Sequence, residues 1–214
     1  VAPPKSPVLD TSTIAAPDKD GITTFFFPAT ADCHKNFETV CRAARLLEQQ
    51  VGKGRFKVVL TIDGSENKYS AWLRKEFGDV DSIRFTGLLP KDKLYATYAA
   101  TDCLLFPSRI ETWGLPISEF AAFHRPMLLA DLPYAHETSA GNDQVAFFNP
   151  DSPSDLAAKM RHVIDGDLSL FSPNPPLSTP HPLAPSWPAL FSLLLSEVHT
   201  DPTDSTDIIG SLTR

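Results

Sequence analysis

Apolar residues along the chain form two kinds of run, and the two kinds alternate. Residues 23–28 (TTFFFP) and 102–107 (DCLLFP) are short continuous apolar runs, as expected for strands that are covered on both faces. Residues 36–50 (NFETVCRAARLLEQQ) instead carry apolar side chains at helical spacing, and Gly52 follows as a stop signal. By these criteria we predict strands at 23–28, 55–62, 82–87, 102–107, 126–131 and 144–149, and helices at 36–50, 66–77, 91–100, 116–124, 133–140 and 152–165.

This alternation favours an α/β fold, with a doubly wound, mostly parallel six-stranded Rossmann-like sheet. The helical spacing within 66–77 predicts that Tyr69, Trp72 and Leu73 lie on the buried face of that helix. Ligands of such sheets bind outside the carboxyl ends of the strands, so the candidate binding segments directly follow the strands. They are residues 28–36, 63–66, 87–90, 108–116 and 131–137.

Proline marks the boundaries of the predicted domain. Residues 172–188 carry seven prolines, a density that no helix or central strand tolerates. The first residue is valine rather than methionine, so we expect a fragment or a processed chain. We divide the chain into a linker or N-terminal arm at 1–20, the sheet domain at 21–168, a proline-rich connector at 169–186, a C-terminal helix at 187–200 and a polar tail at 201–214.

Composition and charge argue against several classes of protein. The net charge is −7, and lysine and arginine form no cluster beyond short pairs, which argues against a nucleic-acid partner. No apolar run reaches the ~18 residues that cross a bilayer, and no secretory signal opens the chain, so we predict no transmembrane segment. Three cysteines without metal-like spacing favour reduced thiols in the cytoplasm and no metal site.

Residues 107–120 (PSRIETWGLPISEF) place two acids around a glycine turn. Gly114 allows close approach to the backbone, and Pro116 at the start of the next helix gives up an N–H that has no helical partner. Such a helix start favours an anion such as phosphate, although a turn that needs glycine only for its geometry is the alternative. Glu111, before the turn, and Glu119, in the first full turn of the helix, then suit hydroxyl-rich groups. The pattern suits a nucleotide sugar.

At this point a resemblance to a known family becomes specific. FPSRIETWGLPISEFAAFHRPMLLADLP resembles the E-x7-E signature of retaining glycosyltransferases with the two-domain GT-B fold, in the large family 4. Four further segments resemble successive parts of the donor-binding, C-terminal domain of that family: TTFFFPATADCHKNFETVCRAARLLEQ, VVLTIDGSE, IRFTGLLPKDKLYATYAATDCLLFPS and SWPALFSLLL. The resemblance covers most of residues 21–200 and implies one half of a GT-B fold.

The resemblance implies roles for matching residues. Glu119 matches the glutamate that binds the donor ribose, and Glu111 matches the glutamate that contacts the donor sugar. Lys35 matches the lysine that pairs with the diphosphate, so Glu111 and Lys35 are the implied catalytic residues. The implied cradle for the diphosphate and sugar is the backbone of Trp113, Gly114 and Leu115, and the implied base-binding loop consists of Gly87, Leu88 and Leu89. Gly64 lies in the glycine loop after the second strand.

The chain departs from the family pattern at the predicted diphosphate site. The family usually has Gly-Arg after the first strand, where this chain has Pro28 and Ala29, so one phosphate-neutralising arginine is absent. Arg109 is a candidate replacement, with an exposed loop arginine as the favoured alternative. His34 is a second candidate, with a polar residue at a helix entry as the safer interpretation.

The resemblance implies a function for the chain as a donor-binding domain. It would bind a nucleotide-diphosphate sugar, without a cofactor or metal, for retaining hexosyl-type transfer in polysaccharide or glycoconjugate biosynthesis. The acceptor would be held by a missing N-terminal domain, through which a cytoplasmic protein could also associate peripherally with a membrane. A non-catalytic nucleotide-binding or assembly module and a GT-B-fold sugar-nucleotide epimerase are the alternatives. The base, the sugar and the acceptor stay open.

Overall fold

The computed structural model describes residues 11, 14, 21–176, 184 and 186–197. The chain divides into two compact units, which we describe separately: residues 6–177 form the first unit, and residues 1–5 and 178–214 form the second. Much of the predicted arm, connector and tail therefore lies outside the described residues, and the domain boundaries stay predictions.

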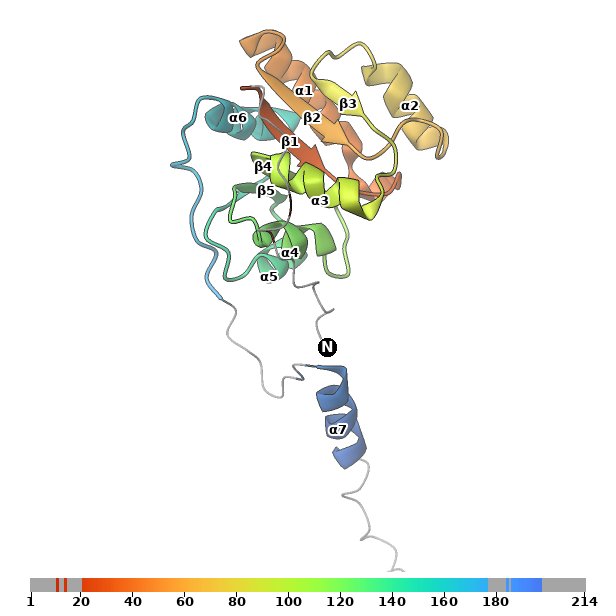
Figure 1. Ribbon diagram of the computed structural model, residues 1–214, viewed down its shortest axis with the longest axis vertical. Helices are drawn as coiled ribbons and strands as arrows, with labels where there is room; N and C mark the ends of the chain where they lie inside the picture. Colours follow the sequence, from red (N-terminus) through yellow and green to blue (C-terminus); the bar gives the residue numbers. More distant parts are fainter. Residues whose placement is uncertain (1–10, 12–13, 15–20, 177–183, 185, 198–214) are drawn as a thin grey trace, which may run out of the picture. The chain divides into compact units, whose positions relative to one another are not determined.

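A six-stranded sheet forms the centre of the first unit (Figure 1). Its strand order is β3-β2-β1-β4-β5-β6, and every neighbouring pair of strands runs parallel. The doubly wound α/β fold is thus confirmed, with a fully parallel sheet in place of the predicted mostly parallel one; one isolated antiparallel bridge joins Val145 and Ser172. The strands are β1 (Thr23–Phe27), β2 (Phe56–Leu60), β3 (Ile83–Phe85), β4 (Cys103–Phe106), β5 (Met127–Ala130) and β6 (Val145–Phe148).

Helices cover both faces of this sheet. The helix α1 packs against α2 and α6 on one face, whereas α3, α4 and α5 come after the chain crosses over toward β4 and cover the other face (Figure 1). The six predicted helices are confirmed, with ends that differ by at most three residues. They are α1 (Phe37–Val51), α2 (Lys68–Phe77), α3 (Lys91–Ala100), α4 (Leu115–Ala121), α5 (Pro133–Thr138) and α6 (Pro153–Ile164), preceded by a short 3-10 helix, η2 (Cys33–Lys35).

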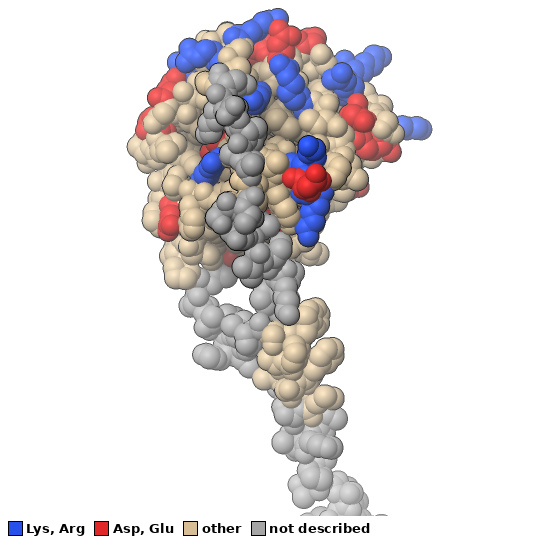
Figure 2. Space-filling model, in the orientation of Figure 1, with Lys and Arg blue, Asp and Glu red and all other residues tan. Residues whose placement is uncertain are grey.

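Basic and acidic side chains are interspersed over the face of the first unit that Figure 2 presents. On this face they do not merge into one continuous basic patch. On this face, attraction of an anion would therefore come from a few local groups rather than from one continuous basic surface.

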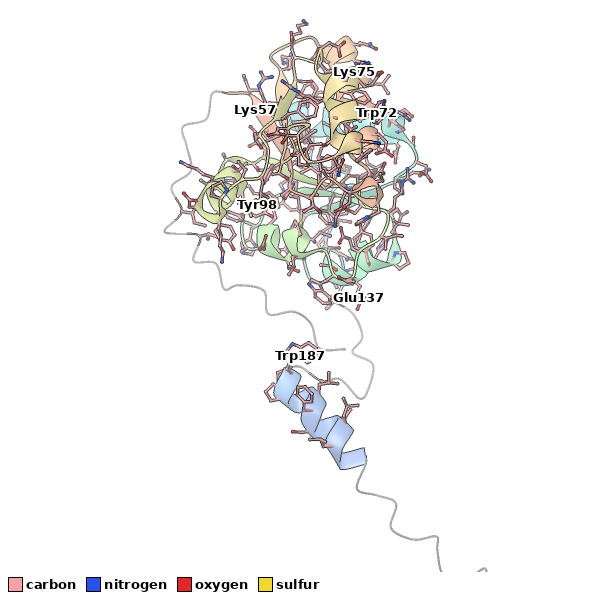
Figure 3. All side chains as sticks on the ribbon, turned by 90° about the vertical axis from the view of Figure 1, so that its right-hand side faces the viewer. Lys57, Trp72, Lys75, Tyr98, Glu137 and Trp187 are labelled. Atoms are coloured by element: carbon pink, nitrogen blue, oxygen red, sulfur yellow. The ribbon has the colours of Figure 1, made fainter. Side chains whose placement is uncertain are left out.

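The apolar runs that predict the strands form the core. Phe25, Phe26 and Phe27 are consecutive in β1 and all fully buried, because helices cover both faces of the sheet. The prediction for Trp72 is wrong: it is 42% exposed and lies on the flank of α2 (Figure 3). Its ring contacts the rings of Tyr69 and Phe77 of the same helix.

The second unit contains α7 (Trp187–Glu197), which lies where the sequence predicts the C-terminal helix. Ser186 caps it, since its Oγ accepts a hydrogen bond from the Ala189 N–H at 3.3 Å. Residues 198–200 of the predicted helix lie outside the described part of the chain. Among the described helices, none combines the length and the apolar character that a bilayer span requires.

Candidate functional site

The five predicted binding segments lie at one edge of the sheet. Each follows the carboxyl end of one of the strands β1 to β5, and all these strands run in the same direction. The change in connection direction lies between β1 and β4, where β2 and β3 extend the sheet to one side and β5 and β6 to the other. In open α/β sheets this is the position at which ligands bind.

The loops after β1 and β4 meet through an ion pair. Lys35 Nζ lies 2.6 Å from Glu111 Oε1, and the two side chains are only 16% and 11% exposed. The backbone joins the same loops, because the Arg109 N–H donates to the His34 carbonyl oxygen at 2.8 Å. The two implied catalytic residues, 76 positions apart in the sequence, are therefore direct neighbours. They meet because β1 and β4 are adjacent strands.

Gly114 makes the turn between β4 and α4. Its φ of 86° is left-handed, and a Cβ at this position would lie 3.3 Å from Ile117 Cδ1 and 3.4 Å from Phe106 Cε1. The turn thus requires glycine for its backbone angle and has little room on its core side. Leu115 opens the helix one residue before the predicted start, and Pro116 is the second helical residue.

Two hydrogen bonds hold Trp113 in place beside this turn. Its indole Nε1 donates to Ser118 Oγ at 2.9 Å, and its carbonyl oxygen accepts from the Thr138 hydroxyl of α5. The Gly114 carbonyl in turn accepts from the Ile117 N–H at 2.9 Å. The backbone of the predicted cradle is therefore fixed by contacts within the protein, before any ligand is considered.

Glu119 lies farther along α4 than predicted. It is the fifth residue of the helix, and the first turn carries no acid, so the predicted first-turn position is wrong because the helix begins at Leu115. One carboxylate oxygen, Oε2, accepts a hydrogen bond from the buried Tyr98 hydroxyl at 3.0 Å. Burial raises the pKa of Glu119 above its ordinary value of 4.5, against the opposing effects of the Tyr98 hydrogen bond and the Lys91 charge.

The loop after β3 contains the predicted base-binding residues. Gly87 has a φ of 70°, and a Cβ there would lie 2.9 Å from Asp63 Oδ2, so only glycine allows this approach of the two loops. Leu88 is 82% exposed, whereas Leu89 is half-buried and packs against the core. Asp63 therefore lies next to this loop. It falls in the predicted binding segment 63–66 but was not singled out from the sequence as a site residue.

In the loop after β2, backbone N–H groups are bound by a carboxylate of the same loop. Glu66 accepts hydrogen bonds from the Asp63 N–H at 2.8 Å and from the Gly64 N–H at 3.0 Å. These bonds lower the pKa of Glu66 against the effect of its partial burial. The Gly64 N–H is thus already occupied, and a ligand phosphate would have to displace Glu66 to use it.

Arg109 is exposed and forms an ion pair with Asp151, and its Nη2 lies 3.4 Å from Asn36 Oδ1. A diphosphate would have to compete with Asp151 for this guanidinium. His34 is exposed and contributes its carbonyl oxygen to the contact between the two loops. Both residues lie at the expected edge, but neither has the burial of Lys35.

Two tyrosines that belong to no sequence motif support the site through hydrogen bonds. Tyr98 holds Glu119, and the Tyr134 hydroxyl donates to the Ser108 carbonyl oxygen at 2.6 Å. Burial, with the Glu111 charge as a smaller contribution, raises the pKa of Tyr134, so it stays protonated and a donor. Their sequence signal is weak, because a tyrosine in an apolar stretch is equally typical of ordinary packing.

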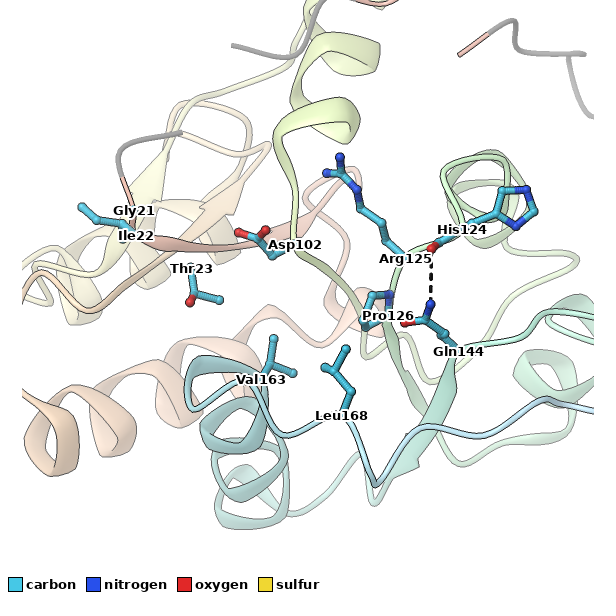
Figure 4. A pocket seen from close by; sticks show the side chains of 11 residues that line it. Gly21, Ile22, Thr23, Asp102, His124, Arg125, Pro126, Gln144, Val163 and Leu168 are labelled. Carbon is cyan, nitrogen blue, oxygen red and sulfur yellow. Dashed lines mark hydrogen bonds between the residues drawn. The ribbon is translucent and has the colours of Figure 1, made fainter. Parts of the chain in front are cut away.

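A hollow of about 520 Å³ lies at the opposite, amino-terminal edge of the sheet (Figure 4). Its lining includes Asp102, Arg125 and Gln144, each close to the start of a strand. Arg125 donates to the carbonyl oxygens of Ala99 and Thr101 at 2.7 and 2.6 Å. None of the sequence-predicted site residues lines this hollow.

All three cysteines are free thiols. Cys41 and Cys103 are buried, and burial raises the pKa of both. Among the described residues, no group of three or more His, Cys, Asp or Glu side chains is arranged to hold a metal ion.

Comparisons with known proteins identify first the class of fold and then the family. The fully parallel Rossmann-like sheet matches one half of GT-B glycosyltransferases in solved structures. The model of the family "Glycosyl transferases group 1" matches residues 23–166, more than half of the chain. The chain therefore belongs to this glycosyltransferase family.

Three solved structures illustrate the likeness. A glycosyltransferase from Rickettsia africae ESF-5 superposes with a TM-score of 0.58 and 18% identity, over 69% of this chain and 38% of that one. TarM gives 0.57 and 16%, over 72% and 31%. Sucrose-phosphate synthase from Thermosynechococcus elongatus gives 0.55 and 18%, over 83% and 45%. The chain thus spans less than half the length of each. No curated protein sequence matches it closely enough to count as a relative.

Proposed function

We propose that the chain is the donor-binding half of a retaining glycosyltransferase of the family 4, E-x7-E type, and that it binds a nucleotide-diphosphate sugar at the carboxyl edge of its sheet. The observation that carries the proposal is the contact of Lys35 with Glu111 across 2.6 Å at the point where the strand order reverses. One cation and one acid, both mostly buried, suit a ligand that presents a diphosphate beside a sugar.

Lys35 is the proposed partner of the diphosphate. An ammonium group has three donors, so Lys35 can keep one hydrogen bond to Glu111 and give others to phosphate oxygens. Its low exposure of 16% reduces competition from water and strengthens the attraction to an anion. In the transfer step, the same charge would stabilise the nucleoside diphosphate as it leaves.

Glu111 is the proposed contact of the donor sugar. Only Oε1 is within 2.6 Å of Lys35, which leaves Oε2 for a sugar hydroxyl. A carboxylate that is held by a lysine and accepts from the sugar would orient the ring for attack at its anomeric carbon. Glu111 would thereby connect occupation of the diphosphate site to the position of the sugar.

The remaining roles follow the chain of contacts along the edge. Glu119 would accept from the ribose through Oε1, since Tyr98 takes Oε2. The turn at Trp113, Gly114 and Leu115 would lie against the diphosphate and sugar, and the loop of Gly87, Leu88 and Leu89 against the base. The acceptor would be held by a domain outside this chain, which agrees with its length relative to the matched structures. A metal-free reaction and a cytoplasmic location are part of the proposal.

A non-catalytic nucleotide-binding module is the second candidate, because the predicted diphosphate site is poor in cations. Pro28 and Ala29 replace the Gly-Arg pair that is usual in the family, and the Ala29 N–H donates to Thr61 Oγ1 at 2.8 Å. The possible substitute, Arg109, is paired with Asp151. Lys35 alone would then hold the diphosphate, which suffices for binding but gives less stabilisation of a leaving group.

Calorimetry and thermal denaturation with nucleoside diphosphates, nucleotide sugars and bare nucleosides test the proposed binding. A bound ligand at 100 times its Kd stabilises the folded state by about 2.7 kcal/mol, which raises the Tm by several degrees. We expect this stabilisation with a nucleoside diphosphate and not with inorganic pyrophosphate alone. No binding of any nucleotide by the folded chain would contradict the proposal. Labelled-donor transfer after joining the chain to an acceptor domain separates the enzyme from the binding module.

A further inference from the structure

Tyr98 is a buried side chain whose hydroxyl reaches the candidate site. It lies on α3 (Figure 3) and is completely shielded from solvent. Its hydroxyl donates to Glu119 Oε2 at 3.0 Å. The pair joins two helices on the same face of the sheet, and the partners are 21 positions apart in the sequence.

Neighbouring rings hold the Tyr98 ring from several sides. Phe26 of β1 packs edge-on at 5.4 Å between ring centroids, and Phe120 of α4 lies at 5.7 Å. Phe123, just after α4, lies at 6.0 Å, and Tyr95 of α3 stacks at 6.3 Å. A ring enclosed in this way has one position, so its hydroxyl can serve as a fixed donor.

The hydrogen bond constrains the orientation of Glu119 and favours its ionised form against the effect of burial. An ionised carboxylate only accepts hydrogen bonds, and a phenolic O–H can donate one. Burial raises the pKa of Tyr98, so it keeps its proton over the whole physiological range. A bond from a neutral donor to an ionised acceptor is charge-assisted and favours the ionised form of Glu119.

We infer that Tyr98 is a positioning residue for nucleotide recognition: it fixes Glu119 through Oε2 and so leaves Oε1 oriented to accept from a ribose hydroxyl. The inference rests on the proposed function, in which Glu119 binds the ribose. Tyr98 itself touches no ligand, because none of its surface is exposed. Its effect on binding must therefore pass through Glu119.

Two neighbouring side chains act on the pKa of Glu119 besides its burial. Burial raises the pKa of Glu119, whereas the Tyr98 hydroxyl and the Lys91 ammonium lower it. Lys91 also lies over the Tyr95 ring, with Nζ 5.6 Å from the ring centroid. Removing the Tyr98 hydroxyl leaves burial opposed by Lys91 alone, so the pKa of Glu119 should rise further.

The chain provides a matched pair of variants. Tyr98→Phe removes the hydroxyl and keeps the ring that packs against Phe26 and Phe120. Tyr95→Phe removes the same atom from the adjacent, half-buried tyrosine on the same helix and leaves the Tyr98–Glu119 bond in place. Affinities for a ribonucleoside diphosphate and its 2′-deoxy counterpart are measured by calorimetry for both variants and the wild type.

We expect Tyr98→Phe to lower the preference for the ribonucleotide at least threefold, while Tyr95→Phe keeps the wild-type preference. In the free protein, a carbon-13 titration of the Glu119 carboxyl, assigned with Glu119→Gln, should show a higher pKa in Tyr98→Phe only. A merely structural role for Tyr98 would weaken both nucleotides alike and leave their ratio unchanged.

The outcomes separate the inference from the proposed function. If wild type binds no nucleotide, the proposed function fails and the inference fails with it. If wild type prefers the ribonucleotide and Tyr98→Phe keeps the same preference, the inference alone is overturned. An unchanged pKa of Glu119 in Tyr98→Phe overturns it without reference to any ligand.

Discussion

The two edges of the sheet differ in what their polar groups do. At the amino-terminal edge, Arg125 donates to two backbone carbonyls at the end of α3, and Gln144 Nε2 lies 3.4 Å from the His124 carbonyl oxygen (Figure 4). At the carboxyl edge, Lys35, Glu111 and Glu119 contact other side chains. The first edge uses its charges to complete the fold, whereas the second holds charged groups next to one another.

The comparison shows why the volume of a hollow is a poor guide to function here. The amino-edge hollow holds about 520 Å³, but its cation already satisfies the carbonyls of a helix C-terminus. An anion bound there would have to draw Arg125 away from them. The carboxyl edge receives the starts of helices, where N–H groups and the positive end of the dipole favour anions. We therefore place the candidate site by chemistry rather than by volume.

The largest expected effects, on nucleotide affinity and on stability, come from replacing one cation at each edge by alanine. Lys35→Ala should weaken a nucleoside diphosphate by about 1.5–3 kcal/mol, or roughly 10- to 150-fold, the range for hydrogen bonds to charged groups. It should leave the affinity for the bare nucleoside unchanged. Arg125→Ala should instead lower the free energy of unfolding by about 1.5–3 kcal/mol and leave nucleotide affinity unchanged. Calorimetry and urea denaturation of both variants provide the measurements.

This pair of variants can contradict the assignment of the nucleotide site to the carboxyl edge. If Arg125→Ala loses as much nucleotide affinity as Lys35→Ala, the ligand binds at the amino-terminal edge. If Lys35→Ala weakens the diphosphate and the nucleoside equally, Lys35 does not contact phosphate.

The second expected effect concerns Glu111. In Glu111→Ala, Lys35 loses its partner and the local negative charge disappears, so affinity for a nucleoside diphosphate should be retained or rise. Affinity for the intact nucleotide sugar should gain less. The ratio of the two affinities should therefore fall about 10-fold, the effect of one hydrogen bond to a charged group. Calorimetry with both ligands measures the ratio.

Glu111→Gln is the control for this ratio, because it removes the charge and keeps an acceptor oxygen. It should retain more of the preference for the nucleotide sugar than the alanine variant does. Equal loss of affinity for both ligands in folded Glu111→Ala would assign Glu111 to loop structure instead.

The third expected effect is on stability and follows from the raised pKa of Glu119. A carboxyl with a higher pKa in the folded than in the unfolded state binds more protons when folded, so stability falls as pH rises from 4.5 through the folded-state pKa and is level above it. Glu119→Gln should remove this decline and be at least as stable as wild type at pH 7. Urea denaturation at several pH values measures the difference. A variant less stable at pH 7 than at pH 4, relative to wild type, would contradict it.

The fold could be predicted from the sequence because its strands are continuous apolar runs. Burial on both faces leaves no polar alternation in β4 or β5, and proline, glycine and helical spacing mark the segments between them. Trp72 was predicted wrongly because periodicity gives the direction of a side chain but not how far a neighbouring element covers it. The order of the strands became clear only in the structure.

The parts of the site that lie within one local sequence motif were predictable. The turn at Gly114 and the loop at Gly87 follow strands and need glycine, and both have positive φ in the structure. The ion pair of Lys35 with Glu111 and the bond from Tyr98 to Glu119 join residues 76 and 21 positions apart. Such contacts depend on which strands are neighbours and on which face of the sheet a helix lies. Neither can be predicted from the local pattern of a single sequence.

The smallest expected effect comes from removing one buried oxygen without a hydrogen-bond partner at each edge of the sheet. Ser108 Oγ, two residues beyond β4, and Gln144 Oε1, directly before β6, are buried and have no hydrogen-bond partner among the described residues. A buried polar atom without a partner costs free energy, so removing it should be neutral or stabilising by up to about 1 kcal/mol. Ser108→Ala and Gln144→Met make the comparison with little change of side-chain volume, and urea denaturation measures it. Gln144→Met also removes the long Nε2 hydrogen bond to the His124 carbonyl oxygen, so its gain should be the smaller of the two.

Nucleotide affinity separates the two edges in these variants as well. Ser108 has no exposed surface, and Tyr134 already holds its carbonyl oxygen, so a ligand does not reach its hydroxyl without a rearrangement of the loop. We therefore expect both variants to bind a nucleoside diphosphate within about threefold of wild type, a change below ~0.7 kcal/mol. A tenfold loss in Ser108→Ala alone would show that the loop after β4 opens on binding and that its buried hydroxyl contacts the ligand. The same loss in Gln144→Met alone would return the hollow at the amino-terminal edge to consideration as the nucleotide site.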